Sequence, residues 1–278
     1  IRLGQTNLVL ITEPPTRREF LGGFKNFKYV TKRIENCDNG IMYESLEGEE
    51  PARASIWIKR ELSENIDSTL LNQFSDKDMV TVLIQITTSL NIKKRIILSS
   101  IYMPHYDVTN KFTHDPMSKK TRDLIMFAKT ENLALIIGSD CNSHSGAWGC
   151  AKDDKRGINL AESCTELELE IVNIGATPTF DIGNKKSIID VTLANNKAIN
   201  LVSNWYVDPR VSFSDHKMIF YELDSQDTGS EYFIDKKKTN WKTFRRKLKN
   251  LLPVLSREPE TPGAVSYTHL TLPTIYSV

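Results

Sequence analysis

The chain has 278 residues, 40% of them hydrophobic and 26% charged, which is ordinary for a globular protein long enough to bury a real core. The net charge of +1 gives no information on a nucleic-acid partner, so that question depends on local clusters of charge. Four scattered cysteines argue against a disulfide framework and favour a reducing compartment. No run is long and apolar enough to span a bilayer.

Short apolar runs rich in β-branched residues recur along the chain and predict strands that are covered on both faces. In chain order they occupy residues 8–11, 54–58, 79–86, 95–101, 133–137, 171–174, 188–193 and 217–223. Two segments with apolar residues at helical spacing, 118–130 and 157–167, predict helices. Because strands outnumber helices, we expect an α/β sandwich: two sheets packed face to face, with helices outside.

A polar run after the last predicted strand indicates a linker, and residues 225–264 are expected to hold this linker and a basic amphipathic helix. The helix has eight basic residues, no acidic residue and an apolar stripe within residues 236–250. Its charges are either solvated while the stripe packs on the main domain, or they contact DNA through Lys242, Arg245 and Arg246.

The main domain is expected to cover residues 1–224. The chain starts at Ile1 with neither an initiator methionine nor a signal peptide, and we therefore expect a fragment of a longer protein. Residues 265–278 resemble a peptide produced by translating sequencing-adapter DNA, and they are excluded from the expected fold and function.

Glu13 directly follows the first predicted strand and precedes two prolines, which end the strand and fix the turn. A carboxylate held in this way suits Mg²⁺, which needs only one or two such ligands and keeps its waters. Taken alone, Glu13 is better interpreted as a surface glutamate.

Asp140 and Asn142 follow a buried predicted strand just beyond Gly138. Residues two apart in an extended segment face the same side, so both side chains can point into one site. A carboxylate beside an amide suits activation of water and orientation of a phosphate. The alternative is an Asx turn that closes the strand.

Ser214, Asp215 and His216 precede the last predicted strand. A histidine can act as general acid or base near neutral pH, although both it and the adjacent aspartate reach one site only if they lie in the turn before the strand. The alternative is a capped turn with an exposed histidine. Asp190 lies inside an apolar strand, where a carboxylate needs a partner. His216 is a natural partner whose ring Asp190 would orient, and a purely structural hydrogen bond is the alternative.

Tyr102 ends another predicted strand, two residues before Pro104. Its hydroxyl could donate a hydrogen bond to a phosphate oxygen, although a core or rim aromatic is the simpler interpretation. Cys141, His144 and Cys150 are weak candidates for a zinc site, because structural zinc sites need four ligands in tighter pairs.

The order of these groups, over about residues 8–223, resembles the endonuclease/exonuclease/phosphatase superfamily. Within that superfamily, the chain most resembles the endonucleases of arthropod non-LTR (LINE-type) retrotransposons. This resemblance lies in Asp140-x-Asn142-x-His144-Ser145-x-x-Trp148-Gly149, in Lys155-Arg156-Gly157, in Pro178-Thr179-Phe180, in the strand around Asp190 and in Asn240-Trp241. The resemblance implies a DNase I-like fold, a two-layer β-sandwich flanked by helices, and it implies that the first strand of that fold is missing from this chain.

The resemblance also implies an activity. It implies a metal-dependent endonuclease that nicks one strand of double-stranded DNA in the nucleus, with Mg²⁺ or Mn²⁺ as cofactor. The nick would prime reverse transcription by a reverse transcriptase downstream in the same polyprotein. The alternatives are a non-catalytic DNA-binding remnant and another phosphodiesterase of the superfamily, such as an abasic-site repair endonuclease or a phosphoinositide phosphatase.

The roles that the resemblance implies follow the order of the chain. Glu13 is the main metal ligand and Asp215 assists it. Asp140 and Asn142 position or activate the attacking water and contact the phosphate. The division of acid and base roles between Asp140 and His216 is left open. Asp190 orients His216, and phosphate or DNA contacts come from Tyr102, Thr179 and Ser214.

Overall fold

The computed structural model describes residues 7–13, 27–28, 30–31, 40–44, 52–59, 62, 66–87, 93–105, 114–210 and 214–223, and between 27 and 44 it describes the backbone alone. The chain divides into two units, Ile1–Asp224 and Ser225–Val278. All described residues belong to the first unit. The predicted basic helix with Lys242, Arg245 and Arg246, and residues 265–278, lie outside the described residues.

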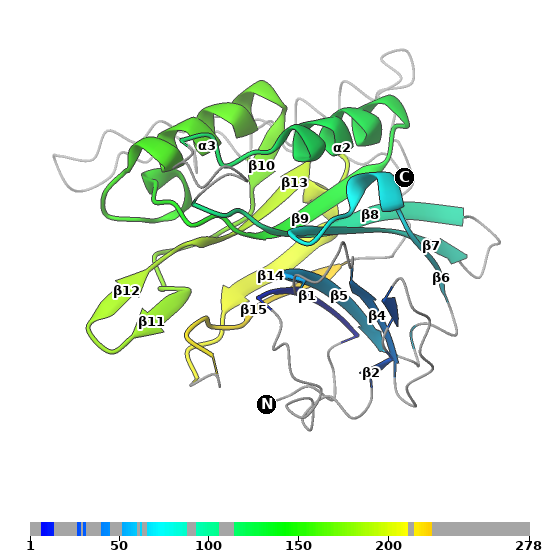
Figure 1. Cartoon of the computed structure of the whole chain (residues 1–278), viewed down its shortest axis with the longest axis horizontal. Helices are drawn as coiled ribbons and strands as arrows, with labels where there is room; N and C mark the ends of the chain where they lie inside the picture. Colours follow the sequence, from blue (N-terminus) through cyan, green and yellow to red (C-terminus); the bar gives the residue numbers. More distant parts are fainter. Residues whose placement is uncertain are drawn as a thin grey trace, which may run out of the picture. The chain divides into compact units, whose positions relative to one another are not determined.

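The larger of two main sheets has six strands in the order β10-β13-β9-β8-β7-β6 (Figure 1). These strands are β6 (Ile66–Leu70), β7 (Met79–Thr87), β8 (Lys93–Tyr102), β9 (Ala134–Asp140), β10 (Leu169–Ile171) and β13 (Asp190–Asn195). β8 and β9 run parallel, and every other neighbouring pair is antiparallel. Helix α2 (Lys119–Thr130) connects the two parallel strands, as a parallel pair requires a crossover.

The second sheet packs on one face of the first. Its strands are β1 (Leu8–Thr12), β2 (Phe27–Lys28), β3 (Val30–Thr31), β4 (Gly40–Glu44) and β5 (Ala54–Lys59). A separate pair, β14 (Val202–Val207) and β15 (Ile219–Leu223), contributes Trp205, Val207 and Tyr221 to the same inter-sheet core. A hairpin, β11 (Phe180–Ile182) and β12 (Lys185–Ser187), projects away from the sheets (Figure 1).

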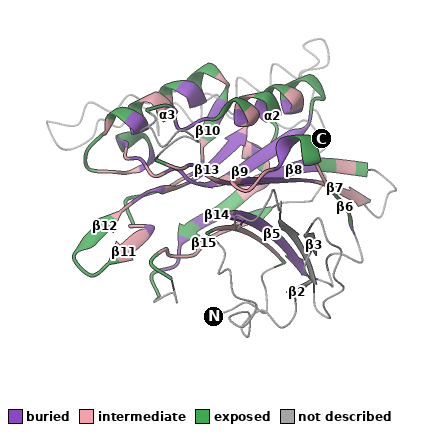
Figure 2. Cartoon of the chain, viewed as in Figure 1, coloured by how far each residue is buried: buried purple, intermediate pink, exposed green. Residues whose placement is uncertain are grey.

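The two described α-helices cover the other face of the six-stranded sheet (Figure 2). α2 is capped by Ser118, whose hydroxyl accepts a hydrogen bond from the Thr121 amide, and α3 (Lys155–Glu166) is capped in the same way by Asp154. Strand β9 serves both cores: Leu135 and Ile137 face the helices, while its alternate residues face the second sheet. Burial on both faces explains why β9 is a continuous apolar run in the sequence.

The predicted fold class, two sheets face to face with helices outside, is confirmed. Both predicted helices are present, and most predicted strands match within a few residues. The strand expected at 171–174 is wrong in position: β10 ends at Ile171, and Ile174 is 71% exposed in the loop beyond it. None of the helices that the structure describes has the length and apolarity needed to cross a bilayer.

Candidate active site

Three strand ends meet at one edge of the six-stranded sheet. Because β8 and β9 are parallel and in register, Tyr102 pairs with Asp140 at their carboxyl ends. β13 runs the opposite way and begins at that edge, so Asp190 pairs with Asp140 from the other side. The register of the sheet therefore brings together three residues that were expected to act in one site.

Glu13 reaches the same place from the second sheet. A carboxylate oxygen of Glu13, one of Asp140 and a ring nitrogen of His216 all lie within 4.8 Å of one another. Among the described residues this is the one group of histidine, cysteine and acidic side chains whose geometry suits a metal ion. Close to this group, the Ser100 hydroxyl on β8 donates a hydrogen bond to the Ile11 carbonyl on β1 at 2.8 Å, which links the two sheets.

Two site residues have strained backbones. Glu13 and Asn142 have φ angles of 49° and 47°, in the left-handed region that non-glycine residues rarely adopt. The Asn142 amide donates to Asp140 Oδ1 at 3.1 Å, and its carboxamide donates to the Met103 carbonyl at 3.3 Å. The Glu13 amide donates to the Arg53 carbonyl at 2.8 Å. Strain of this kind persists where surrounding contacts impose it, and it is concentrated at functional sites.

Asp190 and His216 form a hydrogen-bonded dyad. His216 Nδ1 lies 3.0 and 2.9 Å from the two carboxylate oxygens of Asp190. We assign a proton to Nδ1 because its partner is a carboxylate. The other ring nitrogen, Nε2, lies 3.9 Å from Asp140 Oδ2 and is turned toward the carboxylate cluster.

The charges of the site change the proton affinities of its members. Burial raises the pKa of Asp140, and the charge of Asp190 adds to it, so that this pKa is about 7. Burial acts to lower the pKa of His216, but the hydrogen bond and charge of Asp190, with Asp140 and Glu13, raise it to about 9. His216 therefore carries a proton at neutral pH.

Thr179 lies next to the start of β13 and to the segment that carries His216. Its hydroxyl is fully buried and accepts hydrogen bonds from the Ile189 and Asp190 amides, each at 3.1 Å. Its carbonyl accepts from the Lys217 amide at 2.6 Å. In this structure the hydroxyl is enclosed and accepts two hydrogen bonds, and Thr179 joins the start of β13 to the segment that carries His216. The expected phosphate contact stays a prediction.

Ser214 and Asp215 lie in the turn before His216, and both are exposed. The Ser214 hydroxyl accepts a hydrogen bond from the His216 amide at 3.2 Å, which stabilises the turn. Asp215 is not a member of the metal-ligating group found among the described residues. Its backbone oxygen accepts from the Asp181 amide at 2.8 Å. The turn thus directs His216 inward and leaves its acidic neighbour at the surface.

Tyr102 is half-buried at the end of β8, and Arg53 lies over its ring with the guanidinium carbon 4.7 Å from the ring centroid. Arg53 is held by Asp78, which accepts from it at 2.5 and 2.8 Å. Burial and the charges of nearby carboxylates raise the pKa of Tyr102, so its hydroxyl stays protonated and can donate. Sequence reasoning missed Arg53, because its position next to Tyr102 depends on the pairing of two sheets.

Arg156 is a second residue that sequence reasoning did not place in the site. Its buried guanidinium donates to the carbonyls of Met103, Pro104 and Cys141 at 3.0, 2.9 and 3.3 Å. The Met103 and Pro104 carbonyls directly follow Tyr102 at the end of β8, and the Cys141 carbonyl directly precedes Asn142 after β9. The Lys155-Arg156-Gly157 motif was a usable signal, but it does not show where the side chain goes.

The His144-to-Gly149 motif builds the loop between β9 and α3. His144 bonds Asp154 through Nδ1 at 2.8 Å, and the Trp148 indole donates to the Ile188 carbonyl at 3.1 Å. The Cys141 and Cys150 thiols also donate to backbone carbonyls, at 2.9 and 3.2 Å. Cys141, His144 and Cys150, the weak candidates for a zinc site, thus each have a hydrogen-bond partner within the protein.

Residues 96–220 match the family model described as Endonuclease-reverse transcriptase. The chain is similar to the endonuclease domain of TRAS1, a telomere-specific non-LTR retrotransposon, at 24% identity and a TM-score of 0.58, covering 81% of this chain and 89% of that one. It is also similar to the catalytic domain of Xenopus laevis APE2, at 12% identity and a TM-score of 0.51, covering 81% and 87%. No curated protein sequence matches the chain. Both structural likenesses extend over most of each chain and show a shared fold.

Proposed function

We propose that this protein, whose residues 96–220 belong to the endonuclease–reverse transcriptase family and whose fold is that of the endonuclease/exonuclease/phosphatase superfamily, is a metal-dependent nuclease that nicks one strand of DNA. The observation that carries the proposal is the meeting of Glu13, Asp140 and His216 within 4.8 Å, with Asp190 bonded behind His216. Perturbed titratable groups gathered at one sheet edge are typical of catalytic sites.

The donor set fits a hard divalent cation. Two carboxylates within reach of one point are what Mg²⁺ takes while it keeps its waters, and carboxylate and water oxygens also suit Mn²⁺. Glu13 would be the main ligand, with Asp140 in reach of the same ion. When bound, the ion would stabilise negative charge on the phosphate and on the leaving oxygen.

The residues of the chain supply orientation and proton transfer. Asp140 would accept a proton from the attacking water, and Asn142 would orient the phosphate. His216, held by Asp190 through Nδ1, would direct Nε2–H at the phosphate oxygens and stabilise their charge. The water oxygen bonds to phosphorus, the bond from phosphorus to the 3′ oxygen breaks, and that oxygen takes up a proton. The products are a 3′ hydroxyl and a 5′ phosphate.

A nick with a 3′ hydroxyl can prime DNA synthesis. The description of the matching family as Endonuclease-reverse transcriptase and the likeness to the TRAS1 endonuclease domain support a further part of the proposal. In this part, the nick is made in double-stranded nuclear DNA and primes a reverse transcriptase carried by the same polyprotein.

The test is nicking of supercoiled plasmid by the full chain in Mg²⁺, in Mn²⁺ and in excess chelator. We expect conversion to the open circle with either metal, none in chelator, and extension of the nick by a polymerase. Glu13→Gln should abolish nicking, because the main metal ligand is lost. Glu162→Gln, which neutralises an exposed carboxylate on α3, is the matched control and should nick normally.

Three results would contradict the proposal. Full activity in chelator would rule out the metal. Cleavage confined to duplexes with an abasic site would favour a repair-type nuclease over a general nicking enzyme. DNA binding without cleavage in either metal would identify a non-catalytic remnant.

A further inference from the structure

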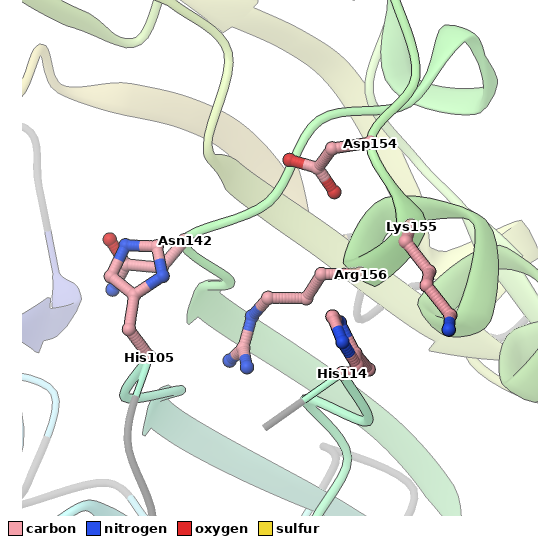
Figure 3. Close-up of a pocket in the computed structure, with 6 residues that line it drawn as sticks. All are labelled: His105, His114, Asn142, Asp154, Lys155 and Arg156. Atoms are coloured by element: carbon pink, nitrogen blue, oxygen red, sulfur yellow. The ribbon is translucent and has the colours of Figure 1, made fainter. Parts of the chain in front are cut away.

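A cavity of about 220 Å³ opens beside the loop that carries Asn142 (Figure 3). It is lined by His105, His114, Asn142, Asp154, Lys155 and Arg156. The lining comes from three places: the loop after β8, the segment before α2, and the stretch from the end of β9 to the start of α3. Asn142 belongs both to this cavity and to the catalytic loop, so the cavity adjoins the place where the phosphate would be cut.

The cavity has an excess of positive charge. Lys155 is exposed at its rim and has no hydrogen bond or ion pair with the residues that the structure describes. Arg156 is 98% buried and lies within the cavity wall, held by three carbonyls (Figure 3). His105 and His114 add ring nitrogens to the lining.

The single carboxylate in the lining is already bonded. Asp154 accepts from the Gly157 amide at 2.6 Å, from the His144 amide at 3.0 Å and from His144 Nδ1 at 2.8 Å. These bonds cap α3, hold the preceding loop and occupy the oxygens of the carboxylate, which stays ionised. The lining therefore has two cations, Lys155 and Arg156, against one carboxylate, and this balance favours an anionic ligand over a cation.

We propose that this cavity binds a backbone phosphate of the DNA strand being cut, next to the scissile phosphate. The inference rests on the proposed function, which makes DNA the substrate. A DNA strand carries one phosphate about every 3.4 Å of helix axis, so a strand positioned for cutting brings neighbouring phosphates close to any cavity that adjoins the site. Such a contact would set the position of the strand without reading its sequence.

The first experiment tests whether one particular phosphate of the DNA contacts the Lys155 side chain. Duplexes with a mapped nick carry a single neutral methylphosphonate at each position near it, and kcat/KM is measured for wild type and for Lys155→Gln. At one position the neutral linkage should slow wild type about twofold to fivefold, the range of an exposed ion pair. The same linkage should have no further effect on Lys155→Gln, because the contact is already lost.

A matched control is available at the far edge of the sheet. A second cavity, of about 170 Å³, lies at the other ends of α2 and α3 and includes the exposed Lys197. Lys197→Gln removes the same charge there and should keep the wild-type response to every methylphosphonate. A response in Lys155→Gln identical to wild type at all positions would overturn the proposal, while leaving the proposed nicking activity intact.

The second experiment does not depend on nicking. Inorganic phosphate is titrated into the metal-free protein while the ring signals of His105 and His114 are followed by NMR. We expect saturable shifts in wild type and Lys197→Gln, and binding weakened about twofold to fivefold in Lys155→Gln. Unmoved signals, or equal weakening in both variants, would overturn the cavity proposal. Saturable binding in a protein that fails to nick would instead contradict the proposed function alone.

Discussion

Both carboxylate oxygens of Asp190 lie within hydrogen-bond distance of Nδ1 of His216, at 3.0 and 2.9 Å, although 26 residues separate the two in the sequence. The apolar strand around Asp190 predicts that its carboxylate has a partner, and the structure confirms that the partner is His216. The Thr179 hydroxyl accepts a hydrogen bond from the Asp190 amide, and the Thr179 carbonyl accepts one from the amide of Lys217, the residue after His216. The dyad is therefore part of a bonded framework, and its members are expected to act as one unit.

Removing either member of the dyad should remove most of its function. We expect Asp190→Asn and His216→Ala each to lower kcat of nicking by about 10²- to 10⁴-fold, the usual contribution of a positioned acid or base. The double variant should be little slower than either single variant, because a unit fails when one part is lost. Multiplicative losses in the double variant would contradict a functional pairing.

The free energy of unfolding should depend on pH through the protonation of His216. Its pKa of about 9 in the folded protein lies above the ordinary value of 6.5, so binding of its proton favours folding. This contribution to the free energy of unfolding is fully present below pH 6.5 and is lost as pH rises toward 9. Urea titrations of metal-free wild type and His216→Gln at several pH values should therefore converge between pH 6.5 and 9.

The same shift has a direct spectroscopic check. In Asp190→Asn the ring loses the carboxylate that most favours its charged form, so NMR titration should show a lower pKa for His216 than in wild type. An unchanged pKa would mean that Asp190 is not the cause of the shift.

Thr179→Val tests how much the buried Thr179 hydroxyl, as a hydrogen-bond acceptor, contributes to stability. The substitution keeps the shape of the side chain but leaves the Ile189 and Asp190 amides without their partner. A buried unsatisfied donor costs about 1–3 kcal/mol, so the free energy of unfolding should fall by that order. Thr179→Ser retains the hydroxyl and should recover most of it. Equal stability of the valine variant and wild type would mean that the hydrogen bonds contribute nothing.

Gly157, in the first turn of α3, and Gly146, in the loop before α3, provide a test substitution and its matched control. A methyl group at Gly157 would lie 1.9 Å from the His144 carbonyl oxygen, whereas one at Gly146 meets only Asp153 Oδ1, at 3.9 Å. Gly157→Ala should lower the free energy of unfolding by about 1–3 kcal/mol or more through overpacking. Gly146→Ala should be nearly neutral. Denaturant melts of the two variants check this, and equal stability would contradict the close approach.

The elements set by local pattern were predictable from the sequence. The apolar run of β9 indicates a strand covered on both faces, and capping by Ser118 and Asp154 agrees with the start of each predicted helix. Asp140 and Asn142 were recognisable as candidate site residues because they follow a buried strand directly. These features depend on residues that are neighbours in the chain, where the period of side chains and the capping preferences operate.

The assembly of the site was decided by tertiary structure alone. Glu13 meets Asp140 only because two sheets pack face to face, and the register of β8 with β9 sets which residues share the edge. The burial of Thr179 and the three carbonyls bound by Arg156 likewise depend on loops that are distant in sequence. A one-residue change of register would turn each side chain to the opposite face, and β9 is apolar on both faces, so its local pattern does not select the register.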